Sequence, residues 1–173
     1  DKSMTLADAG SFDRIRHNLA EVRERIAAAC AQAGRKDQPR IIGVTKYVEP
    51  DLARLLVEAG VDQLAESRPQ ELWRKAEALS DLRAKGRLHW HLIGHLQRNK
   101  VRRTLPLVAC IHSADSLRLL EEISREAASQ PLPADVLLEV NVSGDEAKAG
   151  FAMDQIEPLL PAISELPRVH VLG

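Results

Sequence analysis

The strongest constraint on the fold of this chain is a regular alternation of strand-like and helix-like segments. From residue 41 onward, short runs rich in Ile, Val and Leu alternate with stretches whose apolar residues recur at helical spacing. The expected strands are 41–46, 61–66, 88–94, 110–113, 136–142 and 169–172, and the expected helices are 50–59, 67–79, 97–105, 115–129 and one within 153–165. This spacing predicts βαβ units and therefore an α/β protein with a parallel sheet.

Two closures of such a sheet are open: a doubly wound sheet, or a (β/α)8 TIM barrel. No G-x-G-x-x-G follows the first strand, so the dinucleotide-binding form of the open sheet loses its best support. A complete barrel has eight strands in about 250 residues, whereas this chain has 173 residues and about six expected strands. If the chain is a barrel, we expect it to be truncated after about six strands, leaving 169–172 at an unpaired edge.

A helix is expected ahead of the first strand. Apolar residues recur every three or four positions over 11–34, and Gly34 is placed to end the helix. Residues 1–10 lack this periodicity and are expected to be a frayed lead-in. The helix should pack along the barrel; a dimer seam is the alternative, but a seam this short is weak, so we favour a monomer. We expect one domain over 1–173.

Composition indicates where in the cell the protein is expected. The formal net charge is −1, and the chain has no long apolar run and no signal-peptide pattern at its N-terminus. We therefore expect a cytoplasmic protein without a membrane segment. Cys30 and Cys110 are expected to be buried thiols. The basic stretch 98–103 predicts a solvated helix face, because nucleic-acid binding needs a wider basic surface with stacking aromatics.

Lys46 is the first candidate functional residue, because it ends the first expected strand. In α/β folds, ligands collect at the carboxyl ends of the strands. A lysine at this point is either an ordinary solvated charge or an amine packed against apolar strand residues. The second environment, with Ile42 and Val44 as walls, would favour the neutral amine that condenses with a carbonyl compound. The spacing alone leaves both alternatives open.

Five segments carry a resemblance to a known family. In chain order they are IIGVTKYVEP at 41–50, AESRPQEL at 65–72, WHLIGHLQRNK at 90–100, IHSADS at 111–116 and LLEVNVSGDEAKAGF at 137–151. Together they resemble the pyridoxal phosphate homeostasis protein family, and the third segment is the most specific. The resemblance implies a barrel like the N-terminal domain of alanine racemase. It also implies that pyridoxal 5'-phosphate (PLP) is bound as a Schiff base on Lys46.

The resemblance also implies where the remaining cofactor contacts lie. In this family the phosphate-binding residues and the arginine near the ring nitrogen come from a C-terminal portion that would follow Gly173. We therefore expect this chain to be a fragment that carries the lysine without the phosphate-binding residues. The family often has Gly-Glu-Asn where this chain has Ala65-Glu66-Ser67. Ser67 either contacts the cofactor or caps the following helix together with Gln70.

Two further residues are cofactor-binding candidates. His91 lies on the third strand and would face the cofactor cavity, while His112 is expected to be a hydrogen-bonded packing residue. Asn141 ends the fifth strand at the ligand-bearing edge, where it either orients the cofactor or shapes a turn with Gly144. His89, His91 and His95 could together bind zinc, but no acidic or cysteine ligand has a spacing that completes the set. We expect no metal site.

The expected function is PLP binding in vitamin B6 homeostasis without catalytic turnover, with apo PLP-dependent enzymes as candidate partners. The alternative is a PLP-dependent amino-acid racemase or decarboxylase on the same barrel. Alanine racemase places a lysine and a tyrosine on opposite faces of the cofactor. The only tyrosine here is Tyr47, which strand alternation would point away from Lys46. No catalytic residue is therefore expected.

Overall fold

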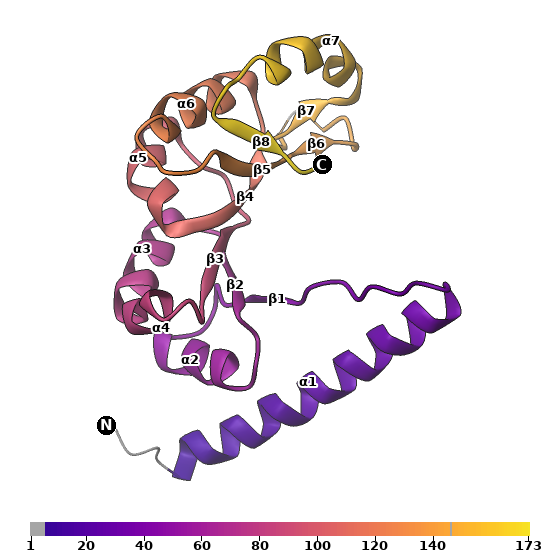
Figure 1. Cartoon of the computed structure of the whole chain (residues 1–173), viewed down its shortest axis with the longest axis vertical. Helices are drawn as coiled ribbons and strands as arrows, with labels where there is room; N and C mark the ends of the chain where they lie inside the picture. Colours follow the sequence, from indigo (N-terminus) through magenta and orange to yellow (C-terminus); the bar gives the residue numbers. More distant parts are fainter. Residues whose placement is uncertain (1–5, 146) are drawn as a thin grey trace.

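The computed structural model describes residues 6–145 and 147–173, and a curved parallel sheet organises them (Figure 1). The sheet has six strands in the order β1-β2-β3-β4-β5-β8, and all neighbours are parallel. They are β1 Ile42–Val44, β2 Gln63–Glu66, β3 His89–Leu92, β4 Val108–Ala114, β5 Ala134–Leu138 and β8 Val169–Val171. A doubly wound sheet reverses its strand order, and this one does not. The arrangement is that of a (β/α) barrel seen as an open arc.

Helices α2 to α7 cover the outer, convex side of the arc, and α1 lies along α2 at the β1 end (Figure 1). The helices are α1 Leu6–Gln32, α2 Pro50–Glu58, α3 Pro69–Ala78, α4 Ser80–Ala84, α5 Val101–Thr104, α6 Leu117–Ala127 and α7 Met153–Ser164. Two 3-10 turns, η1 Arg98–Lys100 and η2 Leu105–Leu107, flank α5, so the expected helix 97–105 is three short pieces. Short strands β6 Val140–Asn141 and β7 Phe151–Ala152 form a second sheet. None of the described helices is long and apolar enough to cross a membrane.

The hydrophobic core lies between the sheet and its helices. Successive strand residues point to opposite faces, so every second side chain points outward toward the helices. Four of these outward residues come from four different strands, and each is fully buried: Leu64, Trp90, Ile111 and Val136. Leu, Ile and Val from the helices complete this aliphatic layer. The remaining strand residues point to the concave side, where the polar side chains of the sheet gather.

The N-terminal helix is longer than the sequence predicts. It begins at Leu6, so the expected lead-in 1–10 is helical in its second half, and its first part, 1–5, lies outside the described residues. Leu19 and Cys30 are buried. Arg23 donates a hydrogen bond to the carbonyl oxygen of Gly60, just after α2, at 2.9 Å. The helix therefore packs on α2, as expected of an element that lies along the barrel.

Two boundaries differ from the sequence prediction because of proline. Helix α3 begins at Pro69 with Arg68 as its N-cap, and no side-chain capping bond is formed there. Proline is favoured at the first helical position, and it starts this helix two residues after Ser67. The predicted cap by Ser67 is therefore wrong. Helix α7 contains Pro158 and Pro161 inside its length, although each removes one backbone hydrogen bond.

The fifth expected strand, 136–142, is interrupted. Strand β5 ends at Leu138, and the chain then pairs with β7 through Val140 and Asn141. Gly150 makes this close pairing possible. It adopts a φ of +114°, and a Cβ there would lie 2.8 Å from the backbone nitrogen of Asn141. The extended region predicted by the Val and Leu residues is thus split between two sheets.

Gly94 joins the loops that follow β2 and β3. A Cβ built on Gly94 would lie 2.1 Å from the carbonyl oxygen of Ser67. One backbone hydrogen bond joins the ends of β2 and β3, and one side-chain hydrogen bond from β4 holds Gly94. Ile93 donates to the carbonyl of Glu66 at 2.9 Å, and the Ser113 hydroxyl donates to the carbonyl of Gly94 at 2.6 Å. Only glycine fits at this contact, so the carboxyl edge of the sheet depends on it.

We expect Gly94→Ala to lower the free energy of unfolding by about 1–3 kcal/mol, because the backbone of one loop must move to admit the methyl group. Urea unfolding followed by circular dichroism measures this. Gly10→Ala in α1 is the matched control, since a Cβ there meets nothing within 4 Å. That change should be neutral or stabilising by about 0.5–1 kcal/mol. Equal stability of the two variants would contradict the assigned contact.

Candidate functional site

Lys46 lies in a turn just beyond β1, at the carboxyl edge of the sheet. The ladder continues one residue past the strand, where Thr45 donates to the carbonyl of Ala65 at 3.0 Å. The chain then turns, and Val48 donates back to the carbonyl of Thr45 at 3.1 Å. Lys46 is thus in a turn and not the last strand residue. This is why Tyr47 does not point away from it as alternation would require: Lys46 Nζ lies 4.9 Å from the centre of the Tyr47 ring.

The surroundings of Lys46 are more open than the sequence predicts. Lys46 itself is exposed, and Val44, one of its two expected apolar walls, is 53% exposed. Ile42 is half-buried. Among the described residues, no carboxylate lies within ion-pairing distance of Lys46 Nζ. The expected apolar enclosure is therefore incomplete, and the amine is accessible from the concave side.

A buried ion pair fixes the backbone next to Lys46. Lys75 on α3 and Glu66 at the end of β2 are each about 1% exposed, and their side chains meet at 2.5 Å. Lys75 Nζ also donates to the carbonyl oxygen of Thr45 at 2.6 Å. The Thr45 hydroxyl donates to the same Glu66 oxygen at 2.7 Å. One network thus joins the end of β1, the end of β2 and helix α3.

Because of this network, the amines of the two lysines near this edge differ in their availability to a ligand. A buried charge is stable only when it is paired and hydrogen-bonded, and Lys75 satisfies both conditions. Its amine is held by Glu66 and by the carbonyl of Thr45, so it is unavailable to a ligand. Lys46 is attached to that same carbonyl through the next peptide bond. The network therefore sets the position from which the Lys46 side chain begins.

Ser67 and Asn141 occupy different kinds of position. Ser67 is half-buried in the bend after β2, the strand next to β1, and it does not cap α3. The Asn141 amide donates to the carbonyl of Asp145 at 2.8 Å, and its oxygen accepts from the Ser143 hydroxyl at 2.8 Å. Of the two roles predicted for Asn141, these bonds support the one that shapes the turn.

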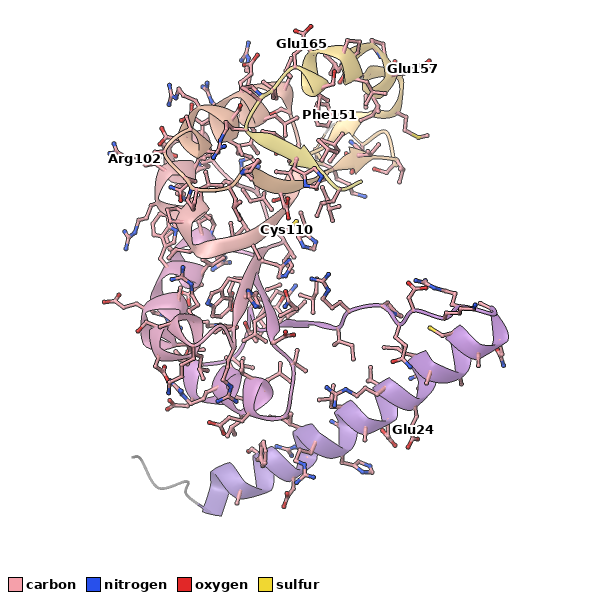
Figure 2. All side chains as sticks on the ribbon, viewed as in Figure 1. Glu24, Arg102, Cys110, Phe151, Glu157 and Glu165 are labelled. Atoms are coloured by element: carbon pink, nitrogen blue, oxygen red, sulfur yellow. The ribbon has the colours of Figure 1, made fainter. Side chains whose placement is uncertain are left out.

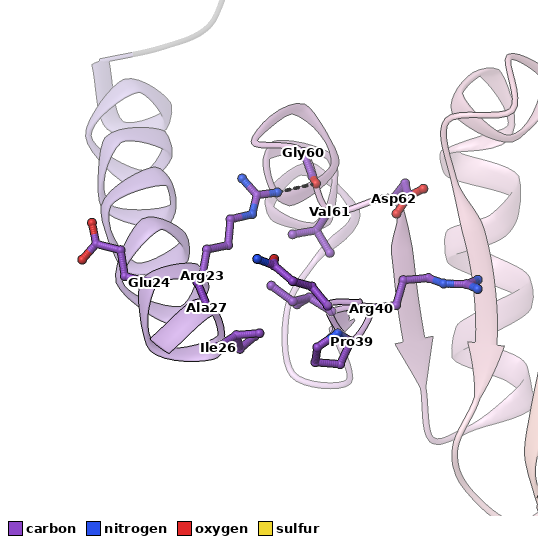
Figure 3. A pocket seen from close by; sticks show the side chains of 11 residues that line it. Arg23, Glu24, Ile26, Ala27, Pro39, Arg40, Gly60, Val61 and Asp62 are labelled. Atoms are coloured by element: carbon purple, nitrogen blue, oxygen red, sulfur yellow. Dashed lines mark hydrogen bonds between the residues drawn. The ribbon is translucent and has the colours of Figure 1, made fainter. Parts of the chain in front are cut away.

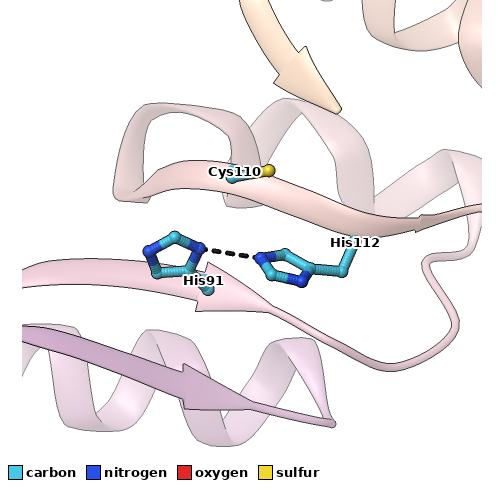
Figure 4. A group of neighbouring side chains, drawn as sticks. All are labelled: His91, Cys110 and His112. Atoms are coloured by element: carbon cyan, nitrogen blue, oxygen red, sulfur yellow. Dashed lines mark hydrogen bonds between the residues drawn. The ribbon is translucent and has the colours of Figure 1, made fainter. Parts of the chain in front are cut away.

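His91 lies on the concave face of β3 in a chain of hydrogen bonds (Figure 4). Its Nε2 lies 2.8 Å from Gln63 Oε1 on β2, and its Nδ1 lies 2.8 Å from His112 Nε2 on β4. Cys110 is on the same concave side of β4, whereas Arg102 lies on the outer, helical side (Figure 2). The expectation that His112 is a hydrogen-bonded packing residue is met.

The electrostatics of this cluster favour uncharged side chains. Burial, with smaller contributions from the nearby charges of His112, Arg40 and His89, lowers the pKa of His91 to about 4. Burial also lowers the pKa of His112. Burial, together with a smaller contribution from the Asp135 carboxylate, raises the pKa of the Cys110 thiol to about 11. At neutral pH both imidazoles are therefore neutral and the thiol is protonated.

The three histidines that the sequence suggested as a zinc site do not form one cluster. His95 Nδ1 lies 2.9 Å from an Asp115 oxygen, and the His95 side chain is mostly exposed. Among the described residues, the group that could hold a metal ion is instead His91, Cys110 and His112. Sequence spacing missed Cys110 and His112, because their place beside His91 depends on the pairing of β3 with β4.

A cleft of about 480 Å³ lies between α1 and the opposite, amino-terminal edge of the sheet (Figure 3). Arg23, Ile26, Arg40 and Val61 are among its lining residues. None of the four predicted site residues lines it. The cleft is therefore separate from the edge that carries Lys46.

Comparison with known proteins supports one family. The alanine racemase N-terminal domain family matches residues 11–173. The "pyridoxal phosphate homeostasis protein" of Aquifex aeolicus is 41% identical over 156 residues, which cover 90% of this chain and 67% of that protein. The chain belongs to the pyridoxal phosphate homeostasis protein family. This confirms the resemblance seen in the five sequence segments.

Solved structures agree with this family and fold. PipY of Synechococcus elongatus PCC7942, solved with PLP bound, has a TM-score of 0.77 and 30% identity, covering 92% of this chain and 68% of PipY. Its form without PLP has a TM-score of 0.80 and 31% identity over the same shares. Alanine racemase of Clostridium difficile 630 matches with a TM-score of 0.63 and 19% identity, covering 92% of this chain and 38% of that enzyme, which shows a shared fold.

We expect Lys75→Met to lower the free energy of unfolding by about 3–5 kcal/mol, because the change leaves the Glu66 carboxylate buried and unpaired. Replacing both residues, as Glu66→Leu with Lys75→Met, should cost less than Lys75→Met alone, because no buried charge remains. Chemical denaturation of the three proteins measures this.

Arg54→Met is the matched control for this ion pair, since it also exchanges a long cation for methionine. Arg54 pairs with Asp81 at the surface, at 2.7 Å, where ion pairs contribute little to stability. The loss of stability should therefore be much smaller. If Lys75→Met were no more destabilising than Arg54→Met, the assigned role of the buried pair would be wrong.

Proposed function

We propose that this chain is a PLP-binding protein of intracellular vitamin B6 homeostasis that holds PLP as a Schiff base on Lys46. The observation that carries the proposal is the state of the Lys46 amine. It is exposed at the carboxyl edge of a parallel barrel arc and is fixed at its base by the Thr45–Glu66–Lys75 network. The naming of the Aquifex aeolicus relative and the PLP-bound structure of PipY support the choice of ligand.

The chain's own residues suit this ligand. When bound, PLP supplies an aldehyde that condenses with a primary amine, and Lys46 offers such an amine without a competing carboxylate among the described residues. Ser67, in the bend beside β1, offers a hydroxyl that can donate or accept one hydrogen bond toward the cofactor. Lys75 is a poor attachment point, because its buried amine already donates one hydrogen bond to Glu66 and one to the carbonyl of Thr45.

His91 and Asn141 would contribute to cofactor binding indirectly. Both ring nitrogens of His91 already have partners, Gln63 and His112, so we assign His91 to the wall of the cofactor cavity. Asn141 holds the turn through Ser143 and Asp145, so its contribution is the shape of the loop after β6. The direct contacts would then come from Lys46 and Ser67.

We also infer that the bound cofactor does not turn over amino acids. Two-base racemisation needs a second proton-transfer group on the face of the cofactor opposite the lysine. Tyr47 is a poor candidate, because it lies in the same turn as Lys46, stacks against its amine and is 89% exposed. Without turnover, the protein would hold PLP in the cytoplasm and release it to apo PLP-dependent enzymes.

Borohydride reduction of the PLP-treated protein should place a pyridoxyl group on the tryptic peptide that contains Lys46. Lys46→Ala should abolish the label together with the yellow chromophore, because the amine at the end of β1 is the proposed attachment point. Peptide mass spectrometry measures the label. Lys36→Ala, which removes an exposed lysine before β1, should keep both. A label of equal yield in Lys46→Ala would reject the assignment.

Incubation of the PLP-loaded protein with L-alanine or D-alanine should give no net racemisation, and incubation with L-lysine or L-ornithine should release no CO2. Chiral chromatography and a coupled CO2 assay measure these outcomes. An alanine racemase serves as the positive control for the first assay. Turnover that disappears in Lys46→Ala would favour the enzyme alternative and contradict the inference of a binding protein.

A further inference from the structure

Three metal-ligand side chains of β3 and β4 meet on the concave side of the sheet. The ligand atoms of His91, Cys110 and His112 all lie within 4.8 Å of one another. His91 and Cys110 are buried, and His112 is half-buried. Figure 4 shows the two rings joined edge to edge by a hydrogen bond, with Cys110 on the same strand as His112. Their combination of imidazole and thiol groups is the donor set preferred by zinc.

An irregularity in the sheet creates this cluster. Trp90 pairs with Val108, but the next residue, His91, pairs with Cys110, so Ala109 is an extra residue on β4. Without the extra residue, His91 would face Ala109, and Cys110 would point to the helices. Bulges of this kind re-aim side chains and are frequent at functional sites. Here the bulge turns both Cys110 and His112 to the side of His91.

Gln63 prepares His91 for a metal ion. Its Oε1 accepts a hydrogen bond from His91 Nε2, which leaves the lone pair of the neutral imidazole on Nδ1. That atom faces His112 Nε2 at 2.8 Å. A hydrogen bond to the far nitrogen is the usual means by which proteins orient a metal-binding histidine.

We propose that His91 Nδ1, Cys110 Sγ and His112 Nε2 bind one Zn²⁺ ion that bridges β3 and β4, with a water molecule as the fourth ligand. For Zn–N bonds of about 2.0–2.1 Å, tetrahedral nitrogens lie roughly 3.3 Å apart. The two rings must therefore separate by about half an ångström from their present contact. The proton between the rings moves to His112 Nδ1, and the thiol releases its proton to solvent.

Charges of both signs act on the cluster: Arg40 acts on His91 and opposes a cation, whereas Asp135, on β5, acts on Cys110 and favours one. His170 on β8 pairs with Asp135 at 2.9 Å and holds it on this side of the sheet. The cluster shares His91 with the proposed wall of the cofactor cavity, but neither Lys46 nor Ser67 belongs to it, so metal binding can be tested without PLP.

Cobalt titration of the chelator-treated protein tests the proposal, because Co²⁺ takes the place of zinc and gives visible bands whose strength reports tetrahedral coordination. One Co²⁺ per chain should bind with intense bands that lie clear of PLP absorption, and one equivalent of Zn²⁺ should abolish them. Cys110→Ser and His112→Gln should each lose these bands. Gln63→Leu should weaken affinity by about 10–100-fold.

His95→Gln is the matched control, because it removes a histidine that pairs with Asp115 outside the cluster. It should bind cobalt as the unaltered protein does. Circular dichroism of the metal-free variants shows whether each one folds, and added Zn²⁺ should raise the melting temperature of the unaltered protein but not of Cys110→Ser. The absence of tetrahedral bands, or equal affinity in the folded Cys110→Ser and His112→Gln variants, would overturn the proposal.

Discussion

The buried contact between Lys75, Glu66 and Thr45 is the interaction on which the carboxyl edge of this sheet depends. Removing two charges from water is costly, and their attraction offsets that cost only with good geometry and additional hydrogen bonds. Here the partners come from β1, β2 and α3, so the charges can be satisfied only when all three elements are in place. Burial of the pair therefore favours a single arrangement of the backbone beside Lys46.

The sheet presents two different faces as a consequence of its one-directional winding. Because each strand follows its neighbour in sequence, the helices that connect the strands fall on the convex side, and the aliphatic residues between sheet and helices form the core. The concave side is left with polar groups, including Gln63, His91 and His112. The same topology therefore places Lys46 at the carboxyl edge of the sheet and the hydrogen-bonded polar side chains on its concave face.

Much of this architecture could be predicted from local sequence. Runs of Ile, Val and Leu marked all six strands of the main sheet, and the five motif segments indicated the family. The failures occurred where one residue overrides a pattern. Pro69 moves a helix start away from Ser67, and the turn after Thr45 places Tyr47 against Lys46. The His91 cluster could not be predicted, because it depends on a bulge in strand pairing, which periodicity does not encode.

The central claim is that one amine, Lys46 Nζ, holds the cofactor at the carboxyl edge of the barrel. A crystal structure of the protein grown with PLP tests it most directly. The account predicts continuous electron density between Lys46 Nζ and the cofactor, with the Thr45–Glu66–Lys75 contacts intact beside it. Density joined to another lysine, or cofactor bound away from this edge, would contradict the account.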